Sequence, residues 1–373
     1  MRLLVLTKRQ YMTRDLLNDR FGRFRELPLA LARRGHDVAG ICLSYRKRDQ
    51  GTVIDEDQNS AARVTWHSVN AGRLKLPGLL RFFHRASELA HQVQPDMILA
   101  FSDSFYGIMG MQLARRFSTR FVFDLYDNFE SYASTSIPGI WPLYKRVVRA
   151  ADGVTCVSNA LAHLVRDSYK RDKPTMMITN AVEASIFYPR DKAKCRLALG
   201  LPLDATIIGT AGALYRNRGI DALLRGYELL ENQQAGLHLA IAGPRDSRTK
   251  LPQGSRVHDL GVLPLDKVPL LLNSLDVAVV CNKDSVFGRY CFPQKAYEII
   301  ACHVPTVAAD VGTMSELMQP YIQYLYKPDN PSDLARAVQA QLAAQFVPKL
   351  PVPSWDDVAG DLERFLESIN HCA

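Results

Sequence analysis

The sequence predicts an α/β protein built from two successive parallel-sheet units. Its 373 residues exceed what one ordinary hydrophobic core organises. Apolar residues make up 47% of the chain and charged residues 23%, as in soluble globular proteins. Short apolar segments alternate with helical patterns in two series. They are interrupted once, near 183–192, where Phe187-Tyr188-Pro189 breaks the pattern and marks a linker.

The first series begins with a buried strand over Arg2–Leu6, followed by a helix over Arg23–Arg34 that ends at Gly35. Glycine at this position is typical of a helix C-terminus, because it adopts the left-handed turn at little cost. A strand over 36–42 follows directly. Strand, helix and strand joined by short links indicate a parallel sheet. Later strands of the same sheet are predicted at 95–100, 120–125 and 153–157.

The second series starts with a β-branched strand over Ala205–Ala211 and a helix over Ile220–Leu230. Further strands are predicted at 237–243, 276–281 and 305–309, and helices at 268–274 and 294–302. No G-x-G-x-x-G follows the first strand of either series, which disfavours a nicotinamide dehydrogenase. A phosphate-binding G-x-x-x-x-G-K-[ST] loop and a G-x-S-x-G nucleophile elbow are also absent from the sequence.

Positive charge is concentrated in the first half of the chain. Residues 1–180 hold 27 Lys and Arg against 17 Asp and Glu, whereas residues 181–373 hold 19 against 21. This asymmetry favours an anionic partner for the first half, such as a lipid surface or a phosphorylated acceptor. Nucleic acid is disfavoured, because no recognition motif accompanies the charge.

The chain is expected to be intracellular. The apolar stretch before Lys8 is too short for a signal peptide, and no run reaches the roughly 18–20 residues of a membrane span. Seven cysteines, at 42, 156, 195, 281, 291, 302 and 372, occur without a C-x-x-C pair and mostly in apolar surroundings. They are expected to be small buried residues, and no metal site is predicted.

Residues 287–298 form the sharpest local pattern. Pro293 is suited to the first turn of a helix, whose free N–H groups attract anions. Lys295 in that turn suits a phosphate or a sugar hydroxyl. Glu298 lies on the same face and suits the paired hydroxyls of a ribose. The alternative is a solvated Lys–Glu pair on a surface helix.

A second segment, 209–219, follows the first strand of the second series. Gly212 would let a ligand approach the backbone, and Arg216 and Arg218 could grip a diphosphate. The alternative is an exposed polar turn.

A third segment, 123–130, ends a predicted strand with Asp124, Asp127 and Glu130, which could orient hydroxyls or bind a cation. These acids could equally be turn formers and helix caps.

A fourth segment, 72–85, alternates basic residues with Leu79, Leu80, Phe82 and Phe83. Such a pattern is expected where a surface meets anionic lipid headgroups, and 141–146 has a similar character. An ordinary core-facing stripe would give the same apolar spacing.

The order of segments resembles glycosyltransferase family 4, whose members have the GT-B fold. The resemblance extends over most of the chain: 31–38, 151–158, 180–183 with 187–189, 212–219, 241–243, 260–262, 292–309 and 354–356. It implies two Rossmann-like domains facing each other across a cleft. The acceptor domain would span 1–185, the nucleotide-sugar domain 186–353, and a C-terminal helix over 354–373 would return to the first domain.

The resemblance also implies roles for individual residues. Glu298 matches the second of two family glutamates, while the first falls on Tyr290. Arg218 matches a diphosphate-binding residue, but its usual arginine partner is Ala213 here. Tyr126 stands where the family often has His, and it precedes Asp127. The implied donor site comprises Gly212, Arg216, Arg218, Gly243, Val262, Tyr290, Pro293, Lys295 and Glu298. The implied catalytic residues are Tyr126, Asp127 and Lys295. Gly22 and Arg23 are implied on the acceptor side.

The implied reaction is metal-independent, retaining transfer of a hexose-type sugar from a UDP- or GDP-sugar, without a cofactor. The acceptor would be a saccharide or a lipid-linked molecule of a bacterial envelope or capsule. The enzyme would work in the cytoplasm, with contact to the anionic inner face of the plasma membrane. A sugar-nucleotide epimerase of the same fold is an alternative. Ala213 and Tyr290 also leave open a catalytically inactive partner protein.

Overall fold

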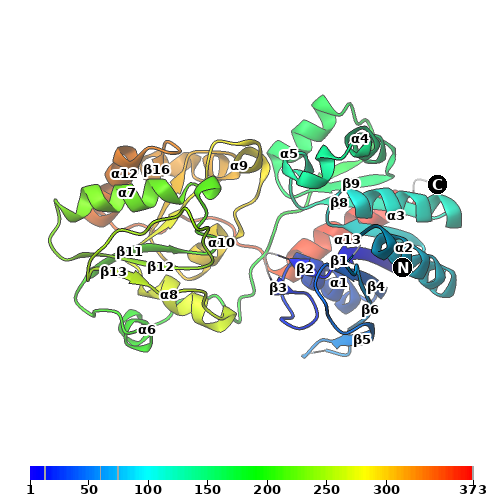
Figure 1. Cartoon of the computed structure of the whole chain (residues 1–373), viewed down its shortest axis with the longest axis horizontal. Helices are drawn as coiled ribbons and strands as arrows, with labels where there is room; N and C mark the ends of the chain where they lie inside the picture. Colours follow the sequence, from blue (N-terminus) through cyan, green and yellow to red (C-terminus); the bar gives the residue numbers. More distant parts are fainter. Residues whose placement is uncertain (12–13, 59, 74, 372–373) are drawn as a thin grey trace. The chain divides into compact units, whose positions relative to one another are not determined.

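The computed structural model describes residues 1–11, 14–58, 60–73 and 75–371, which form two compact units (Figure 1). Unit 1 consists of Met1–Asn180 together with Trp355–Ala373, and unit 2 of Ala181–Ser354. The expected domain boundary at 185 therefore falls inside unit 2. Cys372 and Leu74, which belong to the cysteine set and to the 72–85 segment, lie outside the described residues.

Unit 1 is built on a sheet in the order β10-β9-β8-β7-β1-β4-β6-β5. All its neighbouring strands are parallel except β5 and β6 at one edge. The strands are β1 (Arg2–Lys8), β4 (Asp37–Ser44), β5 (Gly51–Glu56), β6 (Arg63–Asn70), β7 (Met97–Phe101), β8 (Arg120–Leu125), β9 (Gly153–Cys156) and β10 (Thr175–Met177). A small hairpin, β2 (Gln10–Tyr11) and β3 (Arg14–Asp15), follows β1.

The strand order of unit 1 reverses between β1 and β7. The chain runs from β1 outward to β4 and β6, then returns to build β7 to β10 on the other side of β1. Ligands of open parallel sheets bind outside the carboxyl ends of the strands at such a reversal. Lys8 ends β1, and Asp103 follows β7, so both lie at this point.

Two layers of helices cover the sheet of unit 1. On one face α1 packs against α13, and on the other α2, α3 and α4 pack side by side (Figure 1). The helices are α1 (Arg23–Arg33), α2 (Lys75–Val93), α3 (Ser104–Phe117), α4 (Ile140–Ala150), α5 (Asn159–His163) and α13 (Trp355–His371). Gly35, just beyond α1, has the expected positive φ of 90°.

Helix α13 is an integral part of unit 1, although it follows unit 2 in the sequence. Its Glu363 pairs with Arg34 at 2.7 Å and with His36 at 2.8 Å. Gly153 at the start of β9 leaves room for it: a Cβ there would lie 2.2 Å from Ile369 Cδ1. The helix therefore packs so closely on β9 that a larger residue at position 153 would displace the Ile369 side chain.

Unit 2 is built on a fully parallel sheet in the order β13-β12-β11-β14-β15-β16. Its strands are β11 (Thr206–Ala211), β12 (Leu237–Ala242), β13 (Val257–Asp259), β14 (Val277–Val280), β15 (Thr306–Ala309) and β16 (Leu325–Tyr326). The order reverses between β11 and β14. The carboxyl ends of these two strands are thus the expected ligand position of unit 2.

Helices also cover both faces of the unit 2 sheet. The long α7 and α12 pack together on one face and α6 and α8 on the other (Figure 1). The helices are α6 (Lys192–Leu199), α7 (Ile220–Glu231), α8 (Val268–Ser274), α9 (Val286–Tyr290), α10 (Gln294–Ala301), α11 (Thr313–Leu317) and α12 (Pro331–Ala343). Pro293 is the residue before α10 rather than part of its first turn, with φ −76° and ψ 87°.

No helix among the described residues has the length and apolar character needed to cross a bilayer.

Candidate functional site

The predicted donor residues of unit 2 converge at the carboxyl edge of its sheet. Gly212 follows β11 with φ 111°, and a Cβ built on it would lie 3.4 Å from both Cε and Nζ of Lys295. The lysine side chain from α10 therefore reaches over the end of β11. Gly212 and Lys295, which are 83 positions apart in the sequence, thus meet at the reversal of the strand order.

Backbone packing around Gly212 explains a second predicted residue, Gly243. It follows β12 with φ 143°, and a Cβ there would lie 1.7 Å from the carbonyl oxygen of Gly212. Only glycine allows the two turns to approach so closely. Val262, predicted in the same site, is 68% exposed. Tyr290 is the last residue of α9.

Lys295 and Glu298 are not a solvated surface pair. Both are partly enclosed by protein on α10, and the Glu298 carboxylate accepts a hydrogen bond from Gln294 at 3.3 Å. Burial raises the pKa of Glu298 to about 7, and Lys295 opposes that rise. Burial also lowers the pKa of Lys295. A carboxylate and an ammonium that are costly to hold without a ligand are typical of a binding site.

Arg218 and Arg216 differ in whether their guanidinium groups are free to bind an anionic ligand. The guanidinium of Arg218 stacks 3.1 Å above the centre of the Phe287 ring, and its Nη1 is buried without a hydrogen-bond partner among the described residues. Arg216 instead pairs with Asp221 at 2.8 Å on the surface. Arg218 therefore has a free donor for an oxyanion, whereas Arg216 is already neutralised.

A pocket opens beside these residues in unit 2. It contains both basic and acidic side chains, and it is lined by Tyr215, Arg216, Asn217, Asp221, Asp246, Arg248 and Lys283. These residues follow β11, β12 and β14, so the pocket lies at the same carboxyl edge as the donor residues.

The predicted catalytic residues of unit 1 lie in a chain of hydrogen bonds after β8. The Tyr126 hydroxyl lies 2.6 Å from Lys8 Nζ and 3.1 Å from the Tyr132 hydroxyl, which donates to Asp127 Oδ2 at 2.9 Å. Sequence reasoning missed Lys8 and Tyr132. The signal for Lys8 was its place at the end of an otherwise apolar strand.

Arg23 is not available to an acceptor, contrary to the sequence-based expectation. It is fully buried and makes a bidentate ion pair with Asp124, with distances of 2.6 and 2.9 Å. Asp124 also accepts from the Thr155 hydroxyl at 2.6 Å. Neither side chain is free for a sugar or a cation, and the pair ties α1 to β8. Gly22, just before α1, faces the Tyr11 ring: a Cβ there would lie 2.4 Å from Tyr11 Cδ1.

The remaining candidates can be placed as well. Among the described residues, no group of three or more His, Cys, Asp and Glu could hold a metal ion. Within the part of the chain that the structure describes, six cysteines are free and buried, as expected. The 72–85 segment lies largely on α2, where Phe82 is buried in the core while Leu76 and Leu80 are 68% and 63% exposed.

The sequence matches known families in both units. Residues 23–181 match the family described as "Glycosyl transferase 4-like domain", and residues 205–344 match "Glycosyl transferases group 1". Together with two Rossmann-like units, these matches define a glycosyltransferase of the GT-B fold. The chain belongs to glycosyltransferase family 4.

Two curated relatives are similar over part of their length. A D-inositol 3-phosphate glycosyltransferase of Acidothermus cellulolyticus is 28% identical over 45% of this chain and 40% of its own. The putative teichuronic acid biosynthesis glycosyltransferase TuaC of Bacillus subtilis is 27% identical over 54% of this chain and 49% of its own. The chain thus spans about half the length of the curated relatives it matches.

Two solved structures share the fold over the whole chain. The sucrose-phosphate synthase of Thermosynechococcus elongatus has a TM-score of 0.79 at 19% identity and covers 100% of both chains. Anabaena HepE in complex with UDP has a TM-score of 0.68 at 17% identity and covers 100% of this chain and 98% of its own.

Proposed function

We propose that this protein transfers a hexose-type sugar from a UDP- or GDP-sugar to an anionic acceptor, with retention at the anomeric carbon and without a metal ion. The observation that carries the proposal is that Lys295 reaches Gly212 at the strand-order reversal of unit 2, with the charges of Glu298 and Arg218 close enough to act on its ammonium. UDP is the better-supported nucleotide, because solved structures of HepE with the same fold contain UDP and UDP-glucose.

Each donor residue has a distinct part in this proposal. Glu298 accepts hydrogen bonds from the two ribose hydroxyls, one on each carboxylate oxygen. Arg218 and Lys295 stabilise the negative charge of the diphosphate as it leaves. The bond between the anomeric carbon and the diphosphate oxygen breaks, and a bond to the acceptor oxygen forms. The acceptor proton passes to the departing phosphate oxygen, so no protein nucleophile is needed. Tyr126 and Asp127 of unit 1 are proposed to act on the acceptor side of the reaction.

Several relatives support a phosphorylated or otherwise anionic acceptor. The names of the curated and solved relatives include D-inositol 3-phosphate, sucrose-phosphate and teichuronic acid. The excess of Lys and Arg in residues 1–180 fits such an acceptor. An envelope or capsule polysaccharide is the proposed context, and the bacterial TuaC relative supports it.

A panel of nucleotide-sugars tests the donor assignment by thermal shift. UDP-glucose or GDP-mannose at 100 times its dissociation constant is expected to stabilise the fold by about 2.7 kcal/mol, because it binds only the folded state. Glucose without nucleotide is the control. The absence of a shift with every nucleotide-sugar would contradict the proposal. Slow hydrolysis of the stabilising donor would exclude an inactive partner protein, and its conversion to an epimeric nucleotide-sugar would favour the epimerase.

Contact with an anionic membrane is proposed through the first turns of α2. Leu76 and Leu80 are exposed there, and the basic residues Lys75 and Arg81 lie on the same helix. Apolar side chains flanked by basic ones bind the surface of anionic bilayers.

In vesicle sedimentation, the protein is expected to pellet with vesicles containing phosphatidylglycerol but not with pure phosphatidylcholine. The Leu76→Ser/Leu80→Ser variant should pellet much less. Leu229→Ser on α7, another exposed leucine, is the matched control. Equal sedimentation of all three proteins with the anionic vesicles would refute this surface.

A further inference from the structure

The Lys8 ammonium is a partly buried cation with no carboxylate in direct contact among the described residues. It lies at the end of β1, where the strand order of unit 1 reverses. Among the described residues, no carboxylate oxygen lies within 4.0 Å of it, and its one hydrogen bond is to the Tyr126 hydroxyl at 2.6 Å. A charge that loses part of its contact with water is normally compensated by a partner. An ammonium has three N–H donors, so two remain for a ligand.

Three aromatic rings lie near this ammonium. Its nitrogen lies 5.1 Å from the centre of the Tyr126 ring, 5.8 Å from Tyr132 and 5.9 Å from Phe24. The distances to Tyr126, 2.6 Å to its hydroxyl oxygen and 5.1 Å to its ring centre, place Nζ beyond the hydroxyl edge of the ring rather than over its face. Burial lowers the pKa of Lys8, while the more distant Asp103 and Asp127 oppose this effect. Among the described residues the Tyr126 hydroxyl is the one hydrogen-bond acceptor of the ammonium, so two of its N–H donors remain for a ligand.

The hydrogen bonds from Lys8 run in one direction. An ammonium can only donate, so the Tyr126 oxygen accepts from Lys8 and its own proton is free to go to Tyr132. Tyr132 in turn donates to the Asp127 carboxylate, which can only accept. The chain therefore connects the cation to a carboxylate through two hydroxyl groups. Such a chain fixes the position of the ammonium without neutralising it by direct contact.

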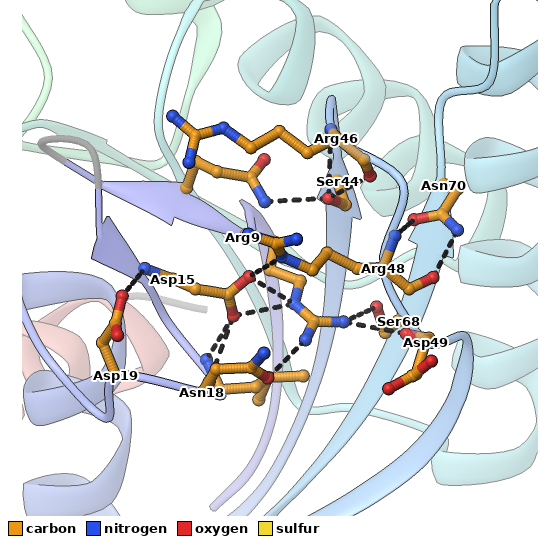
Figure 2. A network of polar contacts seen from close by, with 12 residues as sticks. Arg9, Asp15, Asn18, Asp19, Ser44, Arg46, Arg48, Asp49, Ser68 and Asn70 are labelled. Carbon is orange, nitrogen blue, oxygen red and sulfur yellow. Dashed lines mark hydrogen bonds and ion pairs between the residues drawn. The ribbon is translucent and has the colours of Figure 1, made fainter.

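A second network fixes the backbone next to Lys8. Side chains of consecutive extended residues point to opposite sides. Arg9, the next residue, pairs with Asp15 at 2.8 Å, and Asp15 also accepts from Arg48 at 3.1 Å (Figure 2). The Arg9 guanidinium further donates to Ser68 at 2.8 Å and to Asn18 at 2.7 Å. The segment that carries Lys8 is thus held by a nearly fully buried arginine.

We infer that Lys8 binds an anionic oxygen of the acceptor, a phosphate or a carboxylate, and that Tyr126, Tyr132 and Asp127 are positioning residues that hold its ammonium for that contact. This inference rests on the proposed function and adds the acceptor-recognising residue. It also explains an aromatic hydroxyl at position 126: the Tyr126 oxygen accepts the hydrogen bond from Lys8.

The test is a binding titration of the full chain saturated with UDP. The probes are matched pairs of anionic and neutral sugars: D-glucose 6-phosphate and D-glucuronate against D-glucose, and myo-inositol 1-phosphate against myo-inositol. The unaltered protein is expected to bind an anionic member roughly tenfold or more tightly than its neutral partner, because the new bond is charge-assisted. Lys8→Met should remove this preference, and Lys8→Arg should keep part of it. Lys47→Met, at an exposed lysine, should leave it unchanged.

Tyr132→Phe gives a second, milder test should Lys8→Met fail to fold. It removes the hydroxyl that links Tyr126 to Asp127, so the preference for the anionic sugar should fall while affinity for the neutral sugar stays the same. The inference is overturned if the unaltered protein shows no preference within any pair, or if Lys8→Met and Tyr132→Phe both retain it. UDP affinity, measured in the same samples, tests the donor site separately. A protein that fails to bind UDP would refute the proposed function instead.

Discussion

Replacing Glu298 with alanine is expected to weaken binding of the nucleotide-sugar donor by about 10–100-fold, because hydrogen bonds to a charged group contribute about 1.5–3 kcal/mol. The fold should survive. Burial raises the pKa of this carboxyl group to about 7, so its ionised form is costly to keep in the unliganded protein. Calorimetric titration with UDP-glucose measures the affinity, and thermal unfolding without ligand measures the stability.

The sign of the pH dependence follows from the same pKa. A ribose-binding carboxylate must be ionised, so donor affinity should rise as the pH increases through about 7. Stability of the unliganded protein should change in the opposite sense. Between the ordinary pKa of glutamate and about 7 the folded state holds the proton more tightly, so the contribution of Glu298 to stability falls as the pH rises.

Glu298→Gln is the control for the ribose contact. It keeps the size of the side chain, and it should remove this part of the pH dependence of donor binding. Donor affinity that is unchanged in Glu298→Ala would refute the assigned ribose contact.

Replacing Asp124 with alanine is expected to lower the stability of unit 1 by about 3–5 kcal/mol, because it leaves the fully buried Arg23 without its carboxylate. For a unit of this size the melting temperature should fall by roughly 6–20 °C. Calorimetric unfolding, with donor binding as a separate readout of unit 2, measures the effect. The double variant Arg23→Met/Asp124→Leu removes both charges and is expected to lose less stability than Asp124→Ala.

Asp356→Ala provides the matched control for this prediction. Asp356 also pairs with an arginine of α1, Arg33, at 2.9 Å, but its side chain is 61% exposed. Exposed ion pairs contribute about 0–1 kcal/mol. An equal loss of stability in the two variants would show that the buried Arg23–Asp124 pair contributes no more to stability than the exposed Arg33–Asp356 pair.

The two α/β series could be predicted from the sequence because their strands are short, apolar and fully buried. The predicted ends of β1 and β11 agree with the structure to within two residues. Gly35 adopts the positive φ that its position after α1 predicts. The antiparallel edge strand β5 was not predicted, because its residues are mostly exposed and carry little apolar periodicity.

The donor site was more predictable than the acceptor side. Lys295 and Glu298 are three positions apart on one helix, so their shared face follows from local geometry. The partner of Arg23 is Asp124, about a hundred positions later, and the sequence contains no local sign of that contact. The link between Lys8 and Tyr126 is equally remote. The strand order of a sheet decides which side chains meet at its edge, and local sequence patterns do not specify that order.

The packing of α13 on β9 has a consequence for biosynthesis. Ile369 and Phe365 fill the space that Gly153 leaves, so the core of unit 1 includes residues that are translated after all of unit 2. On the ribosome, all of unit 2 therefore emerges while the part of the unit 1 sheet that α13 covers is still exposed. We expect nascent unit 1 to depend on chaperone protection until its last helix has emerged from the exit tunnel.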